Sequence, residues 1–179
     1  MDDSFDSSLE FTLAEEGGFS GHPRDARFTS NHGISLTRLR RFQRDPGLDE
    51  DAVRYVPCGT VRAIYLADFW NRCRCDALPA GLDLMVFDHA VNAGADRSGR
   101  ALQCATGQII DGAVGPATLE RAACAEPLAL LASLAAAQRT CYRRMAAFGL
   151  FGDGWLARLE RRRAAALALM AIEEPLSRR

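Results

Sequence analysis

The chain has 179 residues, of which 48% are hydrophobic and 25% charged, a balance typical of a one-domain globular protein. Its formal net charge of −1 provides no broad positive field, which argues against a nucleic-acid-binding protein. The longest apolar runs, at 127–137 and 164–172, are too short to span a bilayer. The N-terminus lacks the basic and apolar segments of a secretory signal, so we expect synthesis in the cytosol.

Helical patterns occupy most of the chain. Glycine and proline separate them at 57–59, 79–81 and 148–154. Residues 19–31 have no clear period and predict a loop or a small irregular hairpin. We therefore expect a mainly α fold with helices at 5–16, 36–43, 49–55, 60–72, 82–93, 97–106, from 116 onward, 127–148 and 155–172.

Glu16 is the first candidate for chemistry, because its helical phase places it on an apolar stripe. Its neighbour Glu15 points away from that stripe. A carboxylate on a buried face costs free energy unless it is paired or protonated. Gly17 and Gly18 then end the helix and hold the acid beside an irregular loop. A rigid, half-buried acid is what general-acid catalysis needs, although Glu-Gly-Gly more often ends an ordinary helix. The stripe comprises Phe5, Leu9, Thr12, Leu13 and Glu16.

Asp25 follows Glu16 by nine residues, across a loop that can fold back toward the helix end. Glycosidases use two carboxyl groups, one protonated and one ionised, which stand about 6.5–9.5 Å apart in inverting enzymes. Glu16 on its apolar stripe suits the protonated role, and Asp25 in a polar loop suits the ionised one.

The segment 82–93 is apolar almost all round and predicts a central buried helix. Asp88 and Asn92 are four residues apart on it and share a face. We interpret this pair first as part of a hydrogen-bonded core network. The rival interpretation makes Asp88 the essential carboxylate.

The three histidines and six cysteines show no spacing typical of a metal site, so we expect neither a metal nor a cofactor. The cysteines are expected to be buried free thiols, with one or two disulfides in an oxidising compartment.

Several motifs, in collinear order from about residue 9 to 160, resemble the glycoside hydrolase family 108 muramidases. The first are a Glu-Gly-Gly-aromatic motif, an Asp in a Pro-containing loop, and a Gly-Ile-Ser. The matching stretches are 16–19, Pro23, Asp25, 33–35, 64–65, 69–70, 78–79, 87–94, 102–103, 111–119 and 154–159.

The resemblance implies hydrolysis of the β-1,4 bond between N-acetylmuramic acid and N-acetylglucosamine. It implies that Glu16 is the general acid and that Asp25 positions or activates water. Ser30 stands at the place of the family's Thr, with Thr29 and Asn31 as alternatives. The loop departs from the family pattern at 26–28, which makes Asp25 the less certain match.

Three further positions match the family and are expected to bind substrate, although a structural role is equally open for the second and third. They are Phe19, Asn92 and Gln103. Trp70 and Trp155 are interpreted as core residues rather than sugar platforms.

The resemblance also implies an architecture: a lysozyme-like helical domain of about seven to eight helices. Residues 1–94 would form the catalytic region, and residues 95–179 a peptidoglycan-binding-like region packed into the same globule. We expect a monomer that binds glycan strands, without nucleic acid or membrane insertion. It would reach the wall through a holin, a particle or a secretion system. The alternative is a non-catalytic wall-binding or secretion-accessory protein with the same fold.

Overall fold

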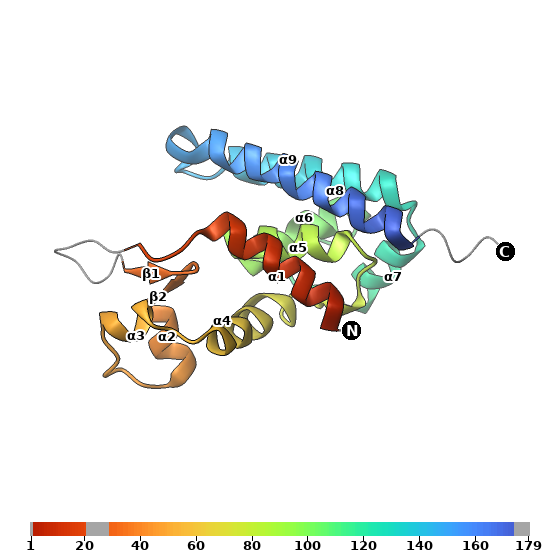
Figure 1. Ribbon diagram of the computed structural model, residues 1–179. Helices are drawn as coiled ribbons and strands as arrows, with labels where there is room; N and C mark the ends of the chain where they lie inside the picture. The colour runs from red at the N-terminus through yellow and green to blue at the C-terminus, as the bar shows by residue number, and fades with distance from the viewer. Residues whose placement is uncertain (1, 21–28, 174–179) are drawn as a thin grey trace.

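The computed structural model describes residues 2–20 and 29–173, and within them the chain is mainly α-helical (Figure 1). A two-residue hairpin, β1 (Ser30–Asn31) and β2 (Ile34–Ser35), is the only sheet in these residues. The α-helices are α1 (Asp2–Glu16), α2 (Leu36–Gln43), α3 (Glu50–Arg54), α4 (Cys58–Tyr65), α5 (Leu82–Ala93), α6 (Ala95–Thr106), α7 (Pro116–Cys124), α8 (Pro127–Arg143) and α9 (Phe148–Glu173).

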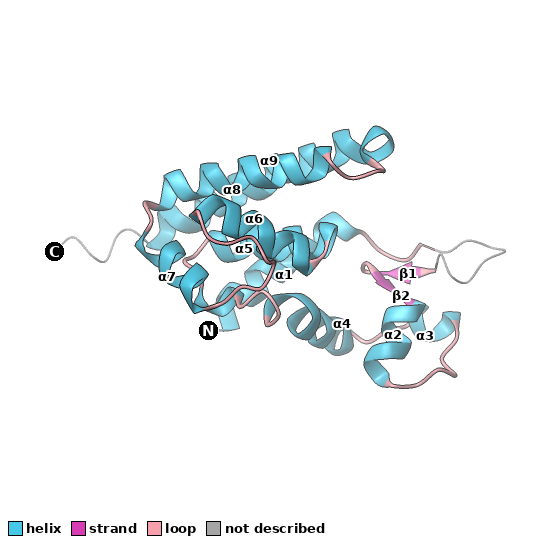
Figure 2. Ribbon diagram, turned by 180° about the vertical axis from the view of Figure 1, so that it is seen from behind, coloured by secondary structure: helices cyan, strands magenta, loops and turns pink. Residues whose placement is uncertain are grey.

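The central helix is α5, which is buried from Leu82 to Ala90. It packs against α1, α6, α8 and α9. Helices α8 and α9 run antiparallel along one side of the molecule, and Figure 2 shows the same layer from behind. The predicted central buried helix is therefore confirmed, with both of its ends at the predicted residues.

A smaller group of elements, formed by the hairpin with α2 and α3, lies at the end of the molecule where α1 terminates (Figure 1). His32 and Gly33 form the hairpin turn with φ angles of 49° and 70°. Two successive residues with positive φ make the tight turn that suits a two-residue hairpin. An antiparallel bridge pairs Ser20 with Ser30.

An aromatic cluster packs α1 and α5 against the turn that follows α4. Phe5 meets Trp70 and Phe87 edge to face, with ring centroids 5.1 and 5.8 Å apart. Trp70 is buried among them, as a core residue should be. The chain reaches this cluster through α4 and a π-helical turn at Leu66–Trp70.

Several predicted boundaries were wrong. The first helix begins at Asp2, α6 begins at Ala95, and α8 ends at Arg143 instead of 148. The fourth helix begins at Cys58 with Pro57 as its N-cap, because Pro57 O already accepts the N–H groups of Thr60 and Val61. The glycine-rich stretch 148–154 is not a link but the first two turns of α9.

One glycine of α9 has a close neighbour in the same helix, whereas Gly149 and Gly154 have nothing within 4 Å. A Cβ at Gly152 would lie 2.7 Å from the Phe148 ring, so the ring uses the space that glycine leaves. The break between α8 and α9 lies at 144–147 instead.

The cysteines are free thiols, but only Cys73 and Cys75 are buried, so the expectation of burial was wrong for the exposed Cys58, Cys104 and Cys124. Within 2–20 and 29–173 no helix combines the length and apolar character needed to cross a membrane.

Candidate active site

Glu16 is the last residue of α1, where Gly17 turns the chain away with φ 71°. Its side chain is 20% exposed, so it is reachable from solvent and still partly enclosed. Arg158, from α9, donates a hydrogen bond of 2.7 Å from Nη1 to Glu16 Oε1. The carboxylate on the apolar stripe is therefore paired, which was one of the two states that its position allowed.

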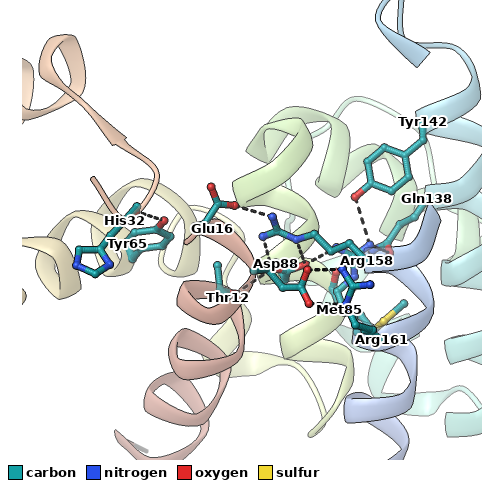
Figure 3. A network of polar contacts seen from close by, with 12 residues as sticks. Thr12, Glu16, His32, Tyr65, Met85, Asp88, Gln138, Tyr142, Arg158 and Arg161 are labelled. Atoms are coloured by element: carbon teal, nitrogen blue, oxygen red, sulfur yellow. Dashed lines mark hydrogen bonds and ion pairs between the residues drawn. The ribbon is translucent and has the colours of Figure 1, made fainter. Parts of the chain in front are cut away.

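Arg158 also holds Asp88, the buried carboxylate of α5 (Figure 3). Its Nε donates to Asp88 Oδ2 at 3.0 Å and its Nη2 to Oδ1 at 2.6 Å. Such a two-point contact fixes the plane of the guanidinium and leaves the third nitrogen aimed at Glu16. Thr12 completes the arrangement by donating to Asp88 Oδ1 at 3.0 Å.

A second arginine closes this network on the core side. Arg162 Nη1 donates to Asp88 Oδ2 at 2.6 Å, and its Nη2 donates to Gln138 Oε1 at 2.8 Å. Burial alone would raise the pKa of Asp88, but the charges of Arg162 and Arg158 and their hydrogen bonds outweigh it and lower the pKa. Asp88 is fully buried and surrounded by protein donors, which supports the core-network interpretation over a catalytic carboxylate.

The hairpin turn forms the opposite wall of the Glu16 site. A Cβ at Gly33 would lie 2.7 Å from Glu16 Oε2 and 2.8 Å from the Tyr65 hydroxyl. The turn therefore lies close to both groups and has no room for a larger residue. Tyr65 donates to His32 O at 2.7 Å. Burial and the nearby charge of Glu16 raise the pKa of Tyr65, which keeps it a neutral donor.

Glu15 points away from Glu16, as their different helical phases predicted. It pairs with the exposed Arg161 through two bonds of 2.7 Å, on the outer side of α9. The Arg161 hydrogen bonds lower the pKa of Glu15. The two adjacent glutamates therefore take the two arginines that lie three residues apart on α9.

The predicted water-positioning residues differ in their surroundings. Ser30 is half-buried in β1, paired with Ser35 and bridged to Ser20. Thr29 is buried, and its hydroxyl has no hydrogen-bond partner among the described residues. Asn31 donates to the carbonyls of Val53 and Arg54, so its amide anchors α3. Asp25, the predicted partner of Glu16, lies outside the described residues.

Phe19 lies three residues beyond Glu16 and is 38% exposed, with the Arg54 guanidinium 4.2 Å from its ring centroid. Asn92 is half-buried on the last turn of α5, and its Oδ1 has no partner in the part of the chain that the structure describes.

Gln103 uses its amide within the turn that follows α6. Its Nε2 donates to Asp111 Oδ1 at 2.6 Å and to Ala113 O at 2.9 Å, and its Oε1 accepts from Gly112 N. These partners belong to the turn and not to the network around Glu16. A substrate-binding role for Phe19, Asn92 and Gln103 stays a prediction.

Arg158 and Arg162 were missed by the sequence analysis, although a signal was present. They are four residues apart and fall on the same helical stripe as the buried Leu159 and Ala166. Two arginines on an inward face require buried acceptors. Asp88 on the central helix was the obvious candidate for one.

A cavity of about 920 Å³ lies between α6 and α8, beneath Arg97, Arg100 and Arg144. None of the predicted site residues lines it. The described residues contain no cluster of three or more His, Cys, Asp or Glu side chains that could hold a metal ion.

Comparisons with known proteins show what the chain is similar to. A family model described as Glycosyl hydrolase 108 matches residues 9–94, which include Glu16, Tyr65 and Asp88. A solved structure, that of SagA from Brucella abortus, is 28% identical with a TM-score of 0.84, covering 95% of this chain and 97% of that chain. None of the curated protein sequences matches. Residues 9–94 of the chain thus match the model of glycosyl hydrolase family 108, which supports a glycosidase, and the fold is mainly helical and lysozyme-like.

Proposed function

We propose that this protein is a muramidase, which hydrolyses the β-1,4 bond between N-acetylmuramic acid and N-acetylglucosamine in peptidoglycan. Glu16 acts as the general acid on the glycosidic oxygen. Asp25 activates or positions the attacking water, assisted by Ser30, and the reaction inverts the anomeric configuration. The substrate is a glycan strand, the enzyme works as a monomer, and no cofactor takes part.

The presentation of Glu16 is the observation that carries this proposal. One carboxyl oxygen is held by Arg158, and the other faces the hairpin turn, with a fifth of the side chain exposed. A general acid must be fixed in orientation and still reach the bond that it protonates. The ion pair with Arg158 fixes the orientation of the Glu16 carboxyl group.

The decisive variant is Glu16→Gln, with Glu15→Gln as a matched control. Gln keeps the shape of the side chain but carries no proton to donate, so we expect activity to fall at least 100-fold. Glu15 pairs outward with Arg161, and its variant should stay within twofold of the parent. The measurement is the loss of turbidity of purified peptidoglycan.

The released fragments identify the reaction. Mass spectrometry should find muramic acid at the reducing ends. Anhydro-muramic ends would mean a lytic transglycosylase, and free stem peptides would overturn the proposal. A parent protein as inactive as Glu16→Gln would favour the non-catalytic wall-binding alternative.

The proposal extends to the second half of the chain and to the setting. Residues 95–179 would bind peptidoglycan while packed into the same globule, and α9 supplies Arg158 from this half. The enzyme would act on the wall after release through a holin, a particle or a secretion system. The need for release is tested by adding the purified protein to intact and to membrane-permeabilised cells. The wall should be degraded only in the permeabilised cells, where the protein can reach it.

A further inference from the structure

The inward face of α9 continues beyond Arg158 toward the start of the helix. Phe151, Trp155 and Arg158 are spaced by four and three residues, so they lie on one stripe. Seven helical residues advance about 10 Å along the axis. Because Arg158 contacts Glu16, this stripe begins at the candidate acid and leads away from it over two turns.

Phe151 is exposed although it lies on the inward stripe. Farther along the helix the same stripe is buried, at Arg158, Leu159 and Arg162, whereas the ring of Phe151 is 57% exposed. Figure 1 shows the first turns of α9 at the end of the molecule that also carries the hairpin and the end of α1. The stripe therefore leaves the core and presents an aromatic surface on the Glu16 side.

The ring is held in place by a stack of aromatic neighbours. Its centroid lies 6.0 Å from that of Trp155, which stacks on Tyr142 at 5.6 Å. Tyr142 is buried, and its hydroxyl lies 3.4 Å from Arg162 Nη2. The stack thus rests on the network that also binds Asp88. A surface ordered before binding loses little conformational entropy when a ligand arrives.

We propose that Phe151, together with the accessible part of Trp155, is a stacking platform for a sugar ring of the glycan strand bound across Glu16. The inference rests on the proposed function and names a binding position that the function does not require. A pyranose ring has an apolar face of C–H groups and a polar rim, so an aromatic face next to open solvent suits it.

The position of Leu150 favours a glycan strand over a membrane or a protein as the ligand of this surface. Leu150 is 83% exposed but lies about 100° from Phe151 around the helix, off the stripe that leads to Glu16. An apolar tip that inserts into a lipid surface would use both side chains. A glycan strand running from Glu16 along α9 meets Phe151 but not Leu150.

The test measures binding without turnover, on the Glu16→Gln background. The probe is a soluble tetrasaccharide of alternating N-acetylmuramic acid and N-acetylglucosamine, titrated by calorimetry. Phe151→Ala should weaken binding about five- to tenfold, because the apolar contact is lost. Phe151→Trp should restore it, and Leu150→Ala should leave it unchanged. Thermal unfolding of each variant verifies that the fold is retained.

Fluorescence gives an independent readout. Trp70 is buried in the core, so a ligand-induced change in tryptophan emission reports on Trp155 beside the platform. The tetrasaccharide should change this emission in Glu16→Gln. The change should be absent from Glu16→Gln with Trp155→Phe and reduced with Phe151→Ala.

The platform is overturned if folded Phe151→Ala binds the tetrasaccharide as tightly as Leu150→Ala does. It is also overturned if the protein binds vesicles of anionic phospholipid and both substitutions weaken that binding equally. Failure of the proposed function looks different, because a Glu16→Gln enzyme that still cleaves glycan refutes the acid and leaves the binding ratio intact.

Discussion

At the scale of single residues, Arg158 determines how Glu16 is presented. Arg158→Met removes the hydrogen bond that Arg158 donates to Glu16 and leaves Asp88 with one arginine, Arg162. We expect kcat to fall about 100-fold, since small misplacements of a reacting group have effects of that size.

The control for this variant is Arg161→Met, three residues away and paired with Glu15 on the surface, which should change kcat by less than twofold. Since opening a buried ion pair costs about 3–5 kcal/mol, Arg158→Lys provides a milder variant that keeps the charge. If folded Arg158→Met is as active as Arg161→Met, Arg158 does not position Glu16.

The sequence predicted side-chain orientation where the position along one helix determines it. It did not predict contacts between residues that are far apart in the sequence. Helical periodicity separated Glu16 from Glu15 because both lie on one regular helix, and their different partners confirm the separation. The partner of Glu16 lies 142 positions away, and no local pattern links the two. Asp25 and the loop around it lie outside the described residues, so its role stays a prediction.

At the scale of elements, the hairpin turn sets the space around Glu16. Gly33 has a φ of 70°, and a Cβ there would crowd Glu16 Oε2 and the Tyr65 hydroxyl. Gly33→Ala should therefore lower the free energy of unfolding by about 2–3 kcal/mol and displace Glu16, with a clear loss of activity. Gly17 has nearly the same φ with nothing within 4 Å, so Gly17→Ala should cost only about 1 kcal/mol.

Chemical denaturation and the turbidity assay on both glycine variants check this. Equal effects of the two substitutions would mean that backbone strain, and not crowding of the acid, governs the turn.

Element boundaries were predictable where capping chemistry is local. Ser35 accepts the Arg38 N–H and starts α2 at the predicted residue. Glycines with positive φ bound α5 at both ends. The start of α9 was missed because glycine usually breaks helices, whereas the glycines of 148–154 are helical in the structure.

At the scale of the whole molecule, burial of charge should make stability depend on pH. Burial and the charge of Arg162 hold the pKa of His89 well below 6.5, with Tyr142 and Asp88 also facing the ring. Below about pH 6.5, His89 binds a proton in the unfolded chain but stays neutral in the folded protein. Stability should therefore fall as pH drops below 6.5, by up to about 1.4 kcal/mol per pH unit.

His89→Phe should remove this dependence between pH 6.5 and 5, measured by urea denaturation across the range. At pH 8 both forms of the parent carry a neutral ring, so that comparison isolates the packing effect of the substitution. A parent protein with the same slope as His89→Phe contradicts the assignment.

The mainly α class followed from periodicity and composition, whereas the relation between the two halves did not. Asp88 lies within the matched residues 9–94, and both of its arginines come from α9. Such a contact between distant segments becomes visible only in three dimensions.

The Arg158–Glu16 pair has a consequence for synthesis on the ribosome. A nascent chain that has emerged as far as α8 carries Glu16, the hairpin and Asp88, but neither arginine of α9. Its acid is unoriented, and its buried carboxylate is uncompensated. Activity is therefore gained only when the last helix docks, so prematurely terminated chains should be both unstable and unable to cleave the wall.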